Sequence, residues 1–293
     1  MSTDATANDV RTYLIGGLNM AVQGHRLCQA LDSLQGMETF ATDGPSAPDI
    51  VVEEATVPAT PDERVLYTFD LNDGYGCCRM LTDVAGNTGY RFGSGSMLVH
   101  DRLGKGHVRL DWRGDLGELR YMLWLAYAHA ALPHEAVPVH SSVVVWHDRA
   151  VLCLGESGTG KSTHTRLWLN NFEGAWLLND DSPIVRIEQG RVWAYGSPWS
   201  GKTPCFRQQR VEVGALLRLK QAPENRIERA KTLIAFASLQ PSCPPSMIHD
   251  ERCADQLIDF VGRVIERVPV YRLDCLPDLD AARLSRDTIF STL

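Results

Sequence analysis

The chain has no long apolar run, no excess of basic charge and few lysines, and these shortages exclude several classes of protein. No stretch of its 293 residues is long and apolar enough to span a bilayer, which argues against a membrane protein. A net charge of −7 argues against a nucleic-acid-binding protein, because such a protein needs a basic face. Arginine greatly outnumbers lysine, so the few lysines, Lys161 and Lys202 among them, stand out.

Paired cysteine motifs are also missing. The eight cysteines are scattered, only Cys77 and Cys78 are adjacent, and no Cys-x-x-Cys or Cys/His metal-binding pattern occurs. The N-terminus is polar and acidic, unlike a secretory signal. We therefore expect reduced thiols, most of which fill the core of a cytoplasmic protein.

Residues 155–163, Gly-Glu-Ser-Gly-Thr-Gly-Lys-Ser-Thr, form the most informative segment of the chain. They fit the Walker A or P-loop pattern Gly-x-x-x-x-Gly-Lys-Ser/Thr, and the apolar residues 150–154 before them read as a strand. Glycines in such a loop let successive N–H groups point at phosphate oxygens, and the following helix adds its positive end. The alternative is a purely structural turn, but the full pattern in this context favours phosphate binding.

The motif predicts that the chain binds ATP together with Mg²⁺. Lys161 can reach the outer phosphates of the nucleotide, and the hydroxyl of Ser162 is placed to ligate magnesium. The residues expected to contact the nucleotide are Gly155, Glu156, Ser157, Gly158, Thr159, Gly160, Lys161, Ser162 and Thr163.

Two acidic residues complete the predicted site. Asp180 and Asp181 end the apolar strand 175–178, roughly twenty residues after Lys161. Adjacent strand residues point to opposite sides, so both side chains can meet at one site only where the strand ends. Phosphoryl transfer needs a metal and a group that orients or deprotonates the attacking hydroxyl, and one carboxylate can serve each purpose. The alternative is a pair of turn aspartates that cap the strand.

Two further residues are candidates on weaker grounds. His140 lies in the expected apolar strand 139–146, where a histidine is more often a satisfied core residue than a functional one. Lys202 lies in a loop rich in glycine, proline and serine, and it could neutralise charge on the transferred phosphoryl group. Arg207 and Arg210 could serve similarly, or Lys202 could be an ordinary surface lysine.

The order of the expected elements predicts a mixed α/β chain with two domains. Residues 1–112 read as strands joined by tight turns, for example at 72–74, and form a smaller β-rich N-terminal domain of unknown role. Residues 113–293 begin with a helix over 114–132 and form the nucleotide-binding domain. Further elements expected there are strands over 184–187, 192–195 and 211–219 and helices around 230–240, 253–264 and from 279.

The approach to the glycine-rich loop is unusual. Two strands joined by a tight turn at 147–149 lead directly into the loop. In an ordinary doubly wound fold a helix separates two adjacent strands of the parallel sheet. The sequence therefore predicts a P-loop core of a different topology.

Three segments together resemble the bacterial HPr serine kinase/phosphorylase and phosphoenolpyruvate carboxykinase superfamily. They are Val-His-Ser-Ser at 139–142, the strand and loop at 150–163, and Leu-Leu-Asn-Asp-Asp at 177–181. In that superfamily a His-bearing strand, the phosphate loop and an Asp-Asp pair converge on nucleotide and metal. The resemblance covers residues 115–290 and implies an HPr-kinase-like P-loop core.

The resemblance also implies a role for each candidate. Lys161 would bind the β- and γ-phosphates, and Ser162 would ligate magnesium. Asp181 would bind the metal, and Asp180 would act as the base or assist it. His140 would lie near the transferred group as a metal ligand or polar partner.

These observations predict an ATP- and Mg²⁺-dependent kinase that transfers a phosphoryl group to a hydroxyl. The expected acceptor is a serine of a peptide or protein, with a small molecule as the alternative. Lys161, magnesium and Lys202 would absorb the developing charge, while Asp180 receives the proton.

Two other functions stay open, a nucleotide-dependent switch that signals through the N-terminal part and a carboxykinase-like enzyme acting on a small carboxylate. We expect no nucleic-acid or membrane partner, and a homo-oligomer is compatible with the sequence.

Overall fold

The computed structural model describes residues 9–44, 47–58, 62–71, 76–101, 106–201 and 203–292 of a mixed α/β protein. The chain divides into two compact units, Met1–His134 and Glu135–Leu293. The predicted boundary between residues 112 and 113 lies before the helix α2, which packs against strands of the first unit. No helix in the described part of the chain is both long and apolar enough to cross a membrane.

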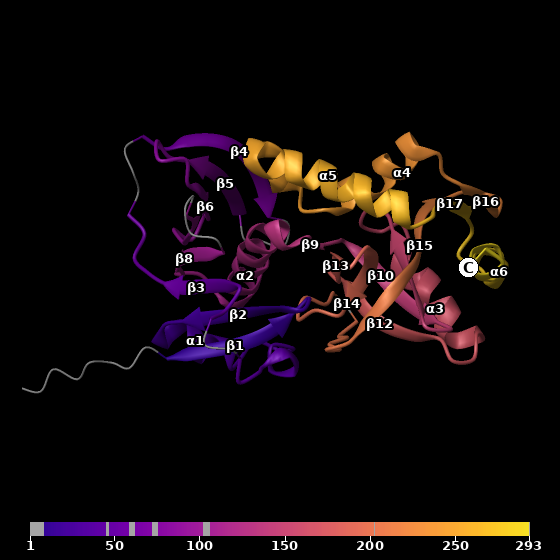
Figure 1. The fold of residues 1–293 in the computed structure, drawn as a ribbon, viewed down its shortest axis with the longest axis horizontal. Coiled ribbons are helices and arrows are strands. Elements are labelled where there is room, and N and C mark those ends of the chain that lie inside the picture. Colours follow the sequence, from indigo (N-terminus) through magenta and orange to yellow (C-terminus); the bar gives the residue numbers. More distant parts are fainter. Residues whose placement is uncertain are drawn as a thin grey trace, which may run out of the picture. The chain divides into compact units, whose positions relative to one another are not determined.

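The first unit contains one mixed sheet and two α-helices (Figure 1). Its eight described strands follow the order β1-β2-β3-β8-β7-β6-β5-β4, and β3 runs parallel to both of its neighbours. The Asp115 carboxylate accepts a hydrogen bond from Glu118 N and thereby starts α2. The elements are β1 (Val10–Ile15), β2 (Leu18–Gln23), α1 (His25–Leu31), β3 (Ile50–Glu54), β4 (Arg64–Leu71), β5 (Gly76–Thr82), β6 (Thr88–Arg91), β7 (Met97–His100), β8 (His107–Asp111) and α2 (Leu116–Ala131).

The second unit is a larger α/β unit with nine described strands. Seven follow the order β12-β10-β11-β15-β14-β13-β9, while β17 pairs with β15, and β16 pairs with β17. The long strand β15 pairs with β14 through its first residues and with β11 and β17 farther along. The elements are β9 (Ala136–Pro138), β10 (Ser141–Trp146), β11 (Arg149–Leu154), α3 (Lys161–Asn171), β12 (Trp176–Asp181), β13 (Ile184–Glu188), β14 (Arg191–Tyr195), β15 (Arg210–Gln221), β16 (Arg226–Arg229), α4 (Thr232–Leu239), α5 (Glu251–Arg267), β17 (Val270–Cys275) and α6 (Leu279–Phe290).

A tight hairpin leads into the glycine-rich loop, as the sequence predicted. Strands β10 and β11 pair antiparallel, and the two central turn residues, His147 and Asp148, have φ angles of 46° and 58°. Two successive positive φ angles define the primed turn whose twist matches that of the flanking strands. On its other edge β10 pairs antiparallel with β12, which puts Ser141 opposite Asp181 and Ser142 opposite Asp180. The end of β12 therefore lies beside the start of β10.

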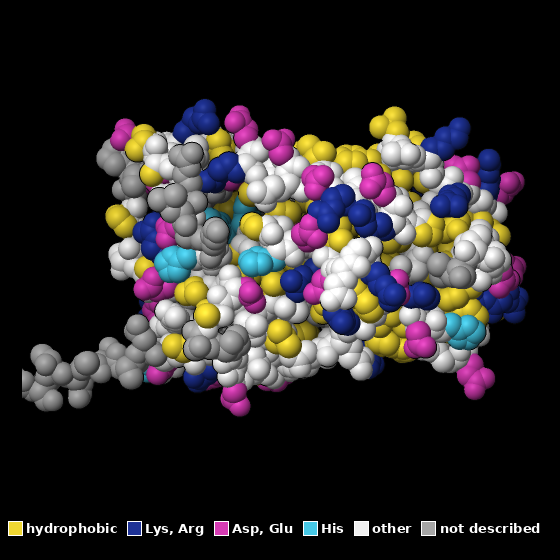
Figure 2. Space-filling view, in the orientation of Figure 1, with side chains coloured by type: hydrophobic (Ala, Val, Ile, Leu, Met, Phe, Trp, Pro, Cys, Tyr) yellow, Lys and Arg dark blue, Asp and Glu magenta, His cyan; other side chains and the backbone are white. Residues whose placement is uncertain are grey.

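The core of the second unit lies between the sheet and the helices α3 and α6. Strand side chains such as Val151 and Leu217 pack there with the fully buried Trp168 of α3 and Ile289 of α6. All eight cysteines are free thiols, and six of them are buried, including Cys153 in this core. On the face of the molecule drawn in Figure 2, basic and acidic side chains are interspersed.

The structure corrects several details of the predicted elements. The strand expected over 139–146 begins only at Ser141, because the N–H of His140 donates to Ser242 O instead of a neighbouring strand. The helix α1 and the strands β2, β5, β7, β9, β16 and β17 were not predicted. The turn expected at 72–74 lies outside the described residues.

Candidate functional site

Glycines shape the loop between β11 and α3. Gly155 has φ 155°, and a Cβ atom there would lie 2.3 Å from Thr159 Oγ1, so a side chain cannot fit. Gly160 has φ 99° and is the N-cap residue of α3. The helix therefore begins at Lys161 with its N-terminus directed at the loop, which is the arrangement that attracts an anion. The Thr159 hydroxyl donates to Glu156 O at 2.8 Å. Four residues of this segment are exposed to solvent: Glu156, Ser157, Ser162 and Thr163.

The ammonium group of Lys161 is buried inside this loop. Its Nζ donates to Gly155 O at 2.8 Å and Glu156 O at 3.0 Å, and it contacts His140 Nε2 at 3.0 Å. Burial is the main cause of a lowered Lys161 pKa, and nearby Asp181 opposes this shift. The lysine is thus held by groups that phosphate oxygens could replace.

His140 joins this lysine to the acidic pair. Its Nδ1 lies 3.1 Å from Asp181 Oδ1, and its Nε2 faces Lys161. A ring nitrogen that accepts from an ammonium group carries no proton, so the contact with Lys161 places the ring proton on Nδ1, on the side of Asp181. His140 therefore lies between Lys161 and Asp181 and contacts both of them.

The two aspartates have different surroundings. Asp180 is 5% exposed and accepts a hydrogen bond of 2.9 Å from Ser162 Oγ. The side chain of Asp181 is 39% exposed. The backbone of Asp181 has φ 147°, which is unusual for a residue with a side chain and indicates local strain. The structure thus brings Asp180 next to Ser162, at the start of α3, and Asp181 next to His140.

A buried asparagine anchors the segment that follows the hairpin β13–β14. The side chain of Asn179 accepts from Ser182 N at 3.1 Å and donates to Ser197 O at 3.3 Å. Gly201 N donates to Asp180 O at 2.6 Å, so this segment lies against the acidic pair. Lys202, the next residue, lies outside the described residues. Arg210 is engaged elsewhere, with Glu188 and Tyr195.

Several residues near the site were not predicted from the sequence. Ser142 Oγ lies 3.0 Å from Thr165 Oγ1 and links β10 to α3, and Ser242 fixes the backbone of His140. Arg218 is close enough to Lys161 to lower its pKa further. Among the residues near the site that were not predicted, only Asn179 stands in a recognisable sequence pattern, as a polar residue between an apolar run and two aspartates.

Two hollows adjoin the glycine-rich loop. The first, of about 590 Å³, is lined by Gly158, Thr159, Gly160, Thr163, His164, Leu219, Gln221, Ala222, Cys275, Leu276 and Pro277. The second, of about 650 Å³, is lined by Glu156, Ser157, Gly158, Thr159, Arg218, Leu219, Lys220, Gln221, Ile234, Ala237, Ser238 and Arg272.

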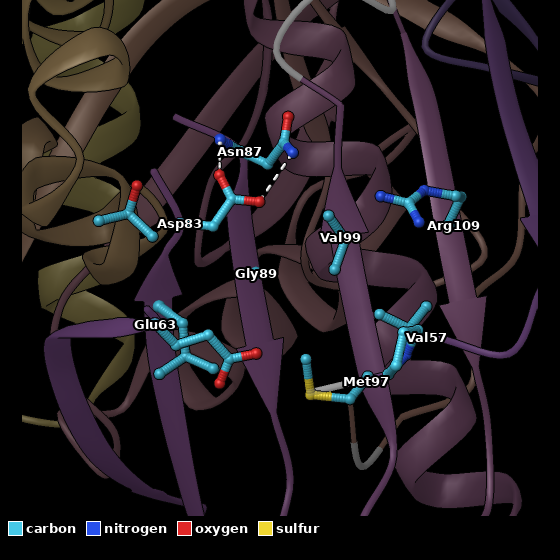
Figure 3. A pocket seen from close by; sticks show the side chains of 11 residues that line it. Val57, Glu63, Asp83, Asn87, Gly89, Met97, Val99 and Arg109 are labelled. Atoms are coloured by element: carbon cyan, nitrogen blue, oxygen red, sulfur yellow. Dashed lines mark hydrogen bonds between the residues drawn. The ribbon is translucent and has the colours of Figure 1, made fainter. Parts of the chain in front are cut away.

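A third, much smaller pocket lies on the sheet of the first unit (Figure 3). It has a volume of about 90 Å³, and its lining includes Val57, Met97 and Val99 beside the polar Asp83 and Arg109. Asp83 is occupied by two hydrogen bonds from Asn87, both of 2.9 Å. Pockets for small ligands usually measure 300–1,000 Å³, so this one is too small for a nucleotide.

Comparisons with known proteins give matches among solved structures. No protein-family model matches the chain, and no curated protein matches it either. A search of solved structures finds the HPr(Ser) kinase/phosphatase from Coxiella burnetii, with 14% sequence identity and a TM-score of 0.32. The match covers 53% of this chain and 97% of the other.

Proposed function

We propose that the second unit is an ATP- and Mg²⁺-dependent kinase that transfers the γ-phosphoryl group to a hydroxyl. The observation that supports this most is the convergence of Lys161, His140, Asp180 and Asp181 at one glycine-rich loop. Phosphoryl transfer relies on positioning and on neutralisation of charge, and this arrangement supplies cationic, acidic and main-chain N–H groups together. We regard residues 135–293 as the catalytic unit with an HPr-kinase-like P-loop core.

The residues present fit a magnesium ion. Ser162 Oγ and an Asp180 carboxylate oxygen lie 2.9 Å apart, and both are the hard oxygen ligands that Mg²⁺ prefers. A bound Mg²⁺ would neutralise charge on the phosphate oxygens during transfer. Lys161 would exchange its carbonyl partners, Gly155 and Glu156, for the β- and γ-phosphates.

The contacts of the two aspartates favour different chemical roles for them from those implied by the family resemblance. Asp180 touches Ser162, the expected magnesium ligand, so we assign Asp180 to the metal. Asp181 is more exposed and lies 3.1 Å from His140, so we assign it to the acceptor hydroxyl, whose proton it would receive. His140 orients that carboxylate, and Lys202 remains our candidate for stabilising charge on the transferred group.

The hollow of about 590 Å³ is the proposed nucleoside pocket. Its volume lies within the usual range for small-molecule sites, and most of its lining beyond the loop is apolar, including Leu219, Leu276 and Pro277. We propose a serine of a peptide or protein as the acceptor, with a small molecule as the second choice.

Magnesium titrations of the Asp180→Asn and Asp181→Asn variants test the assignment. With labelled ATP, phosphoryl transfer or slow ATP hydrolysis is measured across Mg²⁺ concentrations. We expect Asp180→Asn to raise the Mg²⁺ concentration needed for half-maximal rate, and Asp181→Asn to lower the maximal rate about 10²–10⁴-fold. The reverse pattern would support the assignment implied by the resemblance. Full turnover in both variants would contradict a catalytic role for either carboxylate, and nucleotide binding without turnover in the unmodified chain would leave a nucleotide-binding switch as the better explanation.

A further inference from the structure

Three basic side chains share one face of two neighbouring strands. In the parallel pair β15–β17, Arg218 stands opposite Arg272, and Lys220 stands opposite Asp274. The alternate residues, such as Leu217 and Leu219, pack into the core with α3 and α6. Because successive side chains of a strand point to opposite faces, Arg218, Lys220 and Arg272 project away from that core.

The placement of Arg218 directly opposite Arg272 by itself destabilises the sheet. Like charges placed directly opposite on adjacent strands destabilise a sheet. Arg218 has a weak counter-charge, the Glu156 carboxylate at 3.7 Å, and the Glu156 side chain is 85% exposed. Arg272 pairs with Asp274 of its own strand at 3.1 Å and more distantly, at 3.9 Å, with Glu228 of β16, on the side of β17 away from Arg218. An anion arriving from solvent could therefore displace Glu156 and neutralise Arg218.

Arg218, Lys220 and Arg272 line the hollow of about 650 Å³ beside the glycine-rich loop. Arg218 is also paired in register with Leu154, the last residue of β11 before the loop. The helix α4 supplies the apolar part of the lining through Ile234 and Ala237, and the Ile234 side chain is partly exposed. The hollow thus offers cationic groups, an apolar wall and direct access to the loop that we propose binds phosphates.

We propose that this hollow binds residues that flank the acceptor hydroxyl, while the hydroxyl itself lies at Asp181 outside the hollow, and that the acceptor is a peptide segment with carboxylates near its hydroxyl residue. The inference rests on the proposed kinase function and names its substrate class. Arginine pairs with carboxylates in a planar, bidentate geometry, and α4 can cover one apolar side chain of an extended peptide. The nucleotide does not need this hollow, because its phosphates fit the loop and its nucleoside fits the hollow beside Thr163 and Pro277.

Fluorescence anisotropy with two labelled peptides tests the inference. The acidic probe is Glu-Glu-Ser-Glu-Glu-Ala, and its neutral match is Gln-Gln-Ser-Gln-Gln-Ala. We expect the full chain to bind the acidic probe at least tenfold more tightly at low salt, with the difference shrinking as salt is added. Arg218→Gln and Arg272→Gln should each weaken binding of the acidic probe at least fivefold.

Arg226→Gln is the matched control, because Arg226 lies on the neighbouring strand β16 but outside the hollow. It should leave the affinity for the acidic probe within twofold. Equal affinity for the two probes, or an equal loss in Arg226→Gln and Arg218→Gln, would overturn the inference.

A parallel measurement with a non-hydrolysable Mg·ATP analogue separates this inference from the proposed function. We expect Arg218→Gln to weaken binding of the acidic probe much more than binding of the nucleotide. Lys161→Met should weaken binding of the nucleotide much more than binding of the acidic probe. If Arg218→Gln loses nucleotide affinity as strongly as peptide affinity, Arg218 serves to bind the nucleotide, and the inference is overturned. Loss of nucleotide binding from the unmodified chain, with selective binding of the acidic peptide intact, would overturn the kinase proposal alone.

Discussion

At the scale of single residues, Lys161 decides how the site behaves with and without a ligand. Burying an ammonium group costs free energy unless hydrogen bonds and nearby charges offset it. Here two main-chain carbonyls and the His140 ring nitrogen accept from Lys161, and the two aspartates lie close by. The remaining cost appears as a lowered Lys161 pKa. Phosphate oxygens would offer this ammonium group stronger partners than the carbonyls do.

The lowered Lys161 pKa predicts opposite pH effects on ligand binding and on stability. The ordinary value is 10.5, so in the window below it the folded protein releases a proton that the unfolded chain still retains. As pH rises through this window, the affinity for Mg·ATP should fall and the contribution of Lys161 to the free energy of unfolding should increase. Buried thiols such as Cys153 and Cys243, whose pKa burial raises, contribute in the opposite direction, so the Lys161 contribution is measured as a difference from the Lys161→Met variant. In urea unfolding across this window, the unmodified chain should gain stability relative to Lys161→Met as pH rises, and a constant difference between the two proteins would assign the pH dependence to other groups.

The positive φ of Asp181 predicts that its backbone strain can be relieved by glycine. Asp181→Gly and Asp181→Ala remove the same carboxylate, but only glycine adopts this φ without strain. We expect the glycine variant to exceed the alanine variant by about 1 kcal/mol in free energy of unfolding, measured with urea.

The matched pair at Asp180, a residue without a positive φ, should show the reverse order, with the alanine variant the more stable. Alanine and glycine variants of equal stability at Asp181 would contradict the interpretation of strain at this residue.

At the scale of elements, the parts predicted correctly were those with local signals. The hairpin before the loop, the helix after Gly160 and the strand that ends in Asp180 and Asp181 all follow from short sequence patterns. The strand β17 was missed because its pairing with β15 joins segments far apart in sequence, although its run Tyr-Arg-Leu-Asp-Cys alternates apolar and polar residues as a half-buried strand does. The contact between His140 and Ser242 was also missed, because these two residues lie far apart in sequence.

The buried Asn179 predicts how strongly the segment around Ser197 depends on a single side chain. Asn179→Ala would leave Ser182 N and Ser197 O without their amide partners, which should lower the free energy of unfolding by about 1–3 kcal/mol. Because Gly201 contacts Asp180, we expect the rate of phosphoryl transfer to fall as well.

Chemical denaturation and a kinase assay measure the two effects of Asn179→Ala. The exposed Asn171 of α3 provides the matched control, and Asn171→Ala should change stability by less than about 0.5 kcal/mol. Equal stability of the Asn179 and Asn171 variants would show that the buried amide does not anchor this segment.

At the scale of the whole molecule, the second unit contains all of the described candidate site residues and both large hollows. The first unit offers a sheet and a small pocket of about 90 Å³. The glycine-rich loop between β11 and α3 could be predicted because the Walker A motif is a local pattern that requires a strand, a tight loop and a helix in succession. It did not predict the basic face of β15 and β17, because that face exists only once the two strands pair.

Calorimetric titration of the full chain with a non-hydrolysable Mg·ATP analogue tests the central claim most directly. The account predicts saturable binding at one site and at least a 100-fold weaker affinity in Lys161→Met, with the melting temperature of the ligand-free variant nearly unchanged. Undetectable binding to the unmodified chain, or equal affinity in the two proteins, would contradict the claim that this loop and its lysine bind a nucleoside triphosphate.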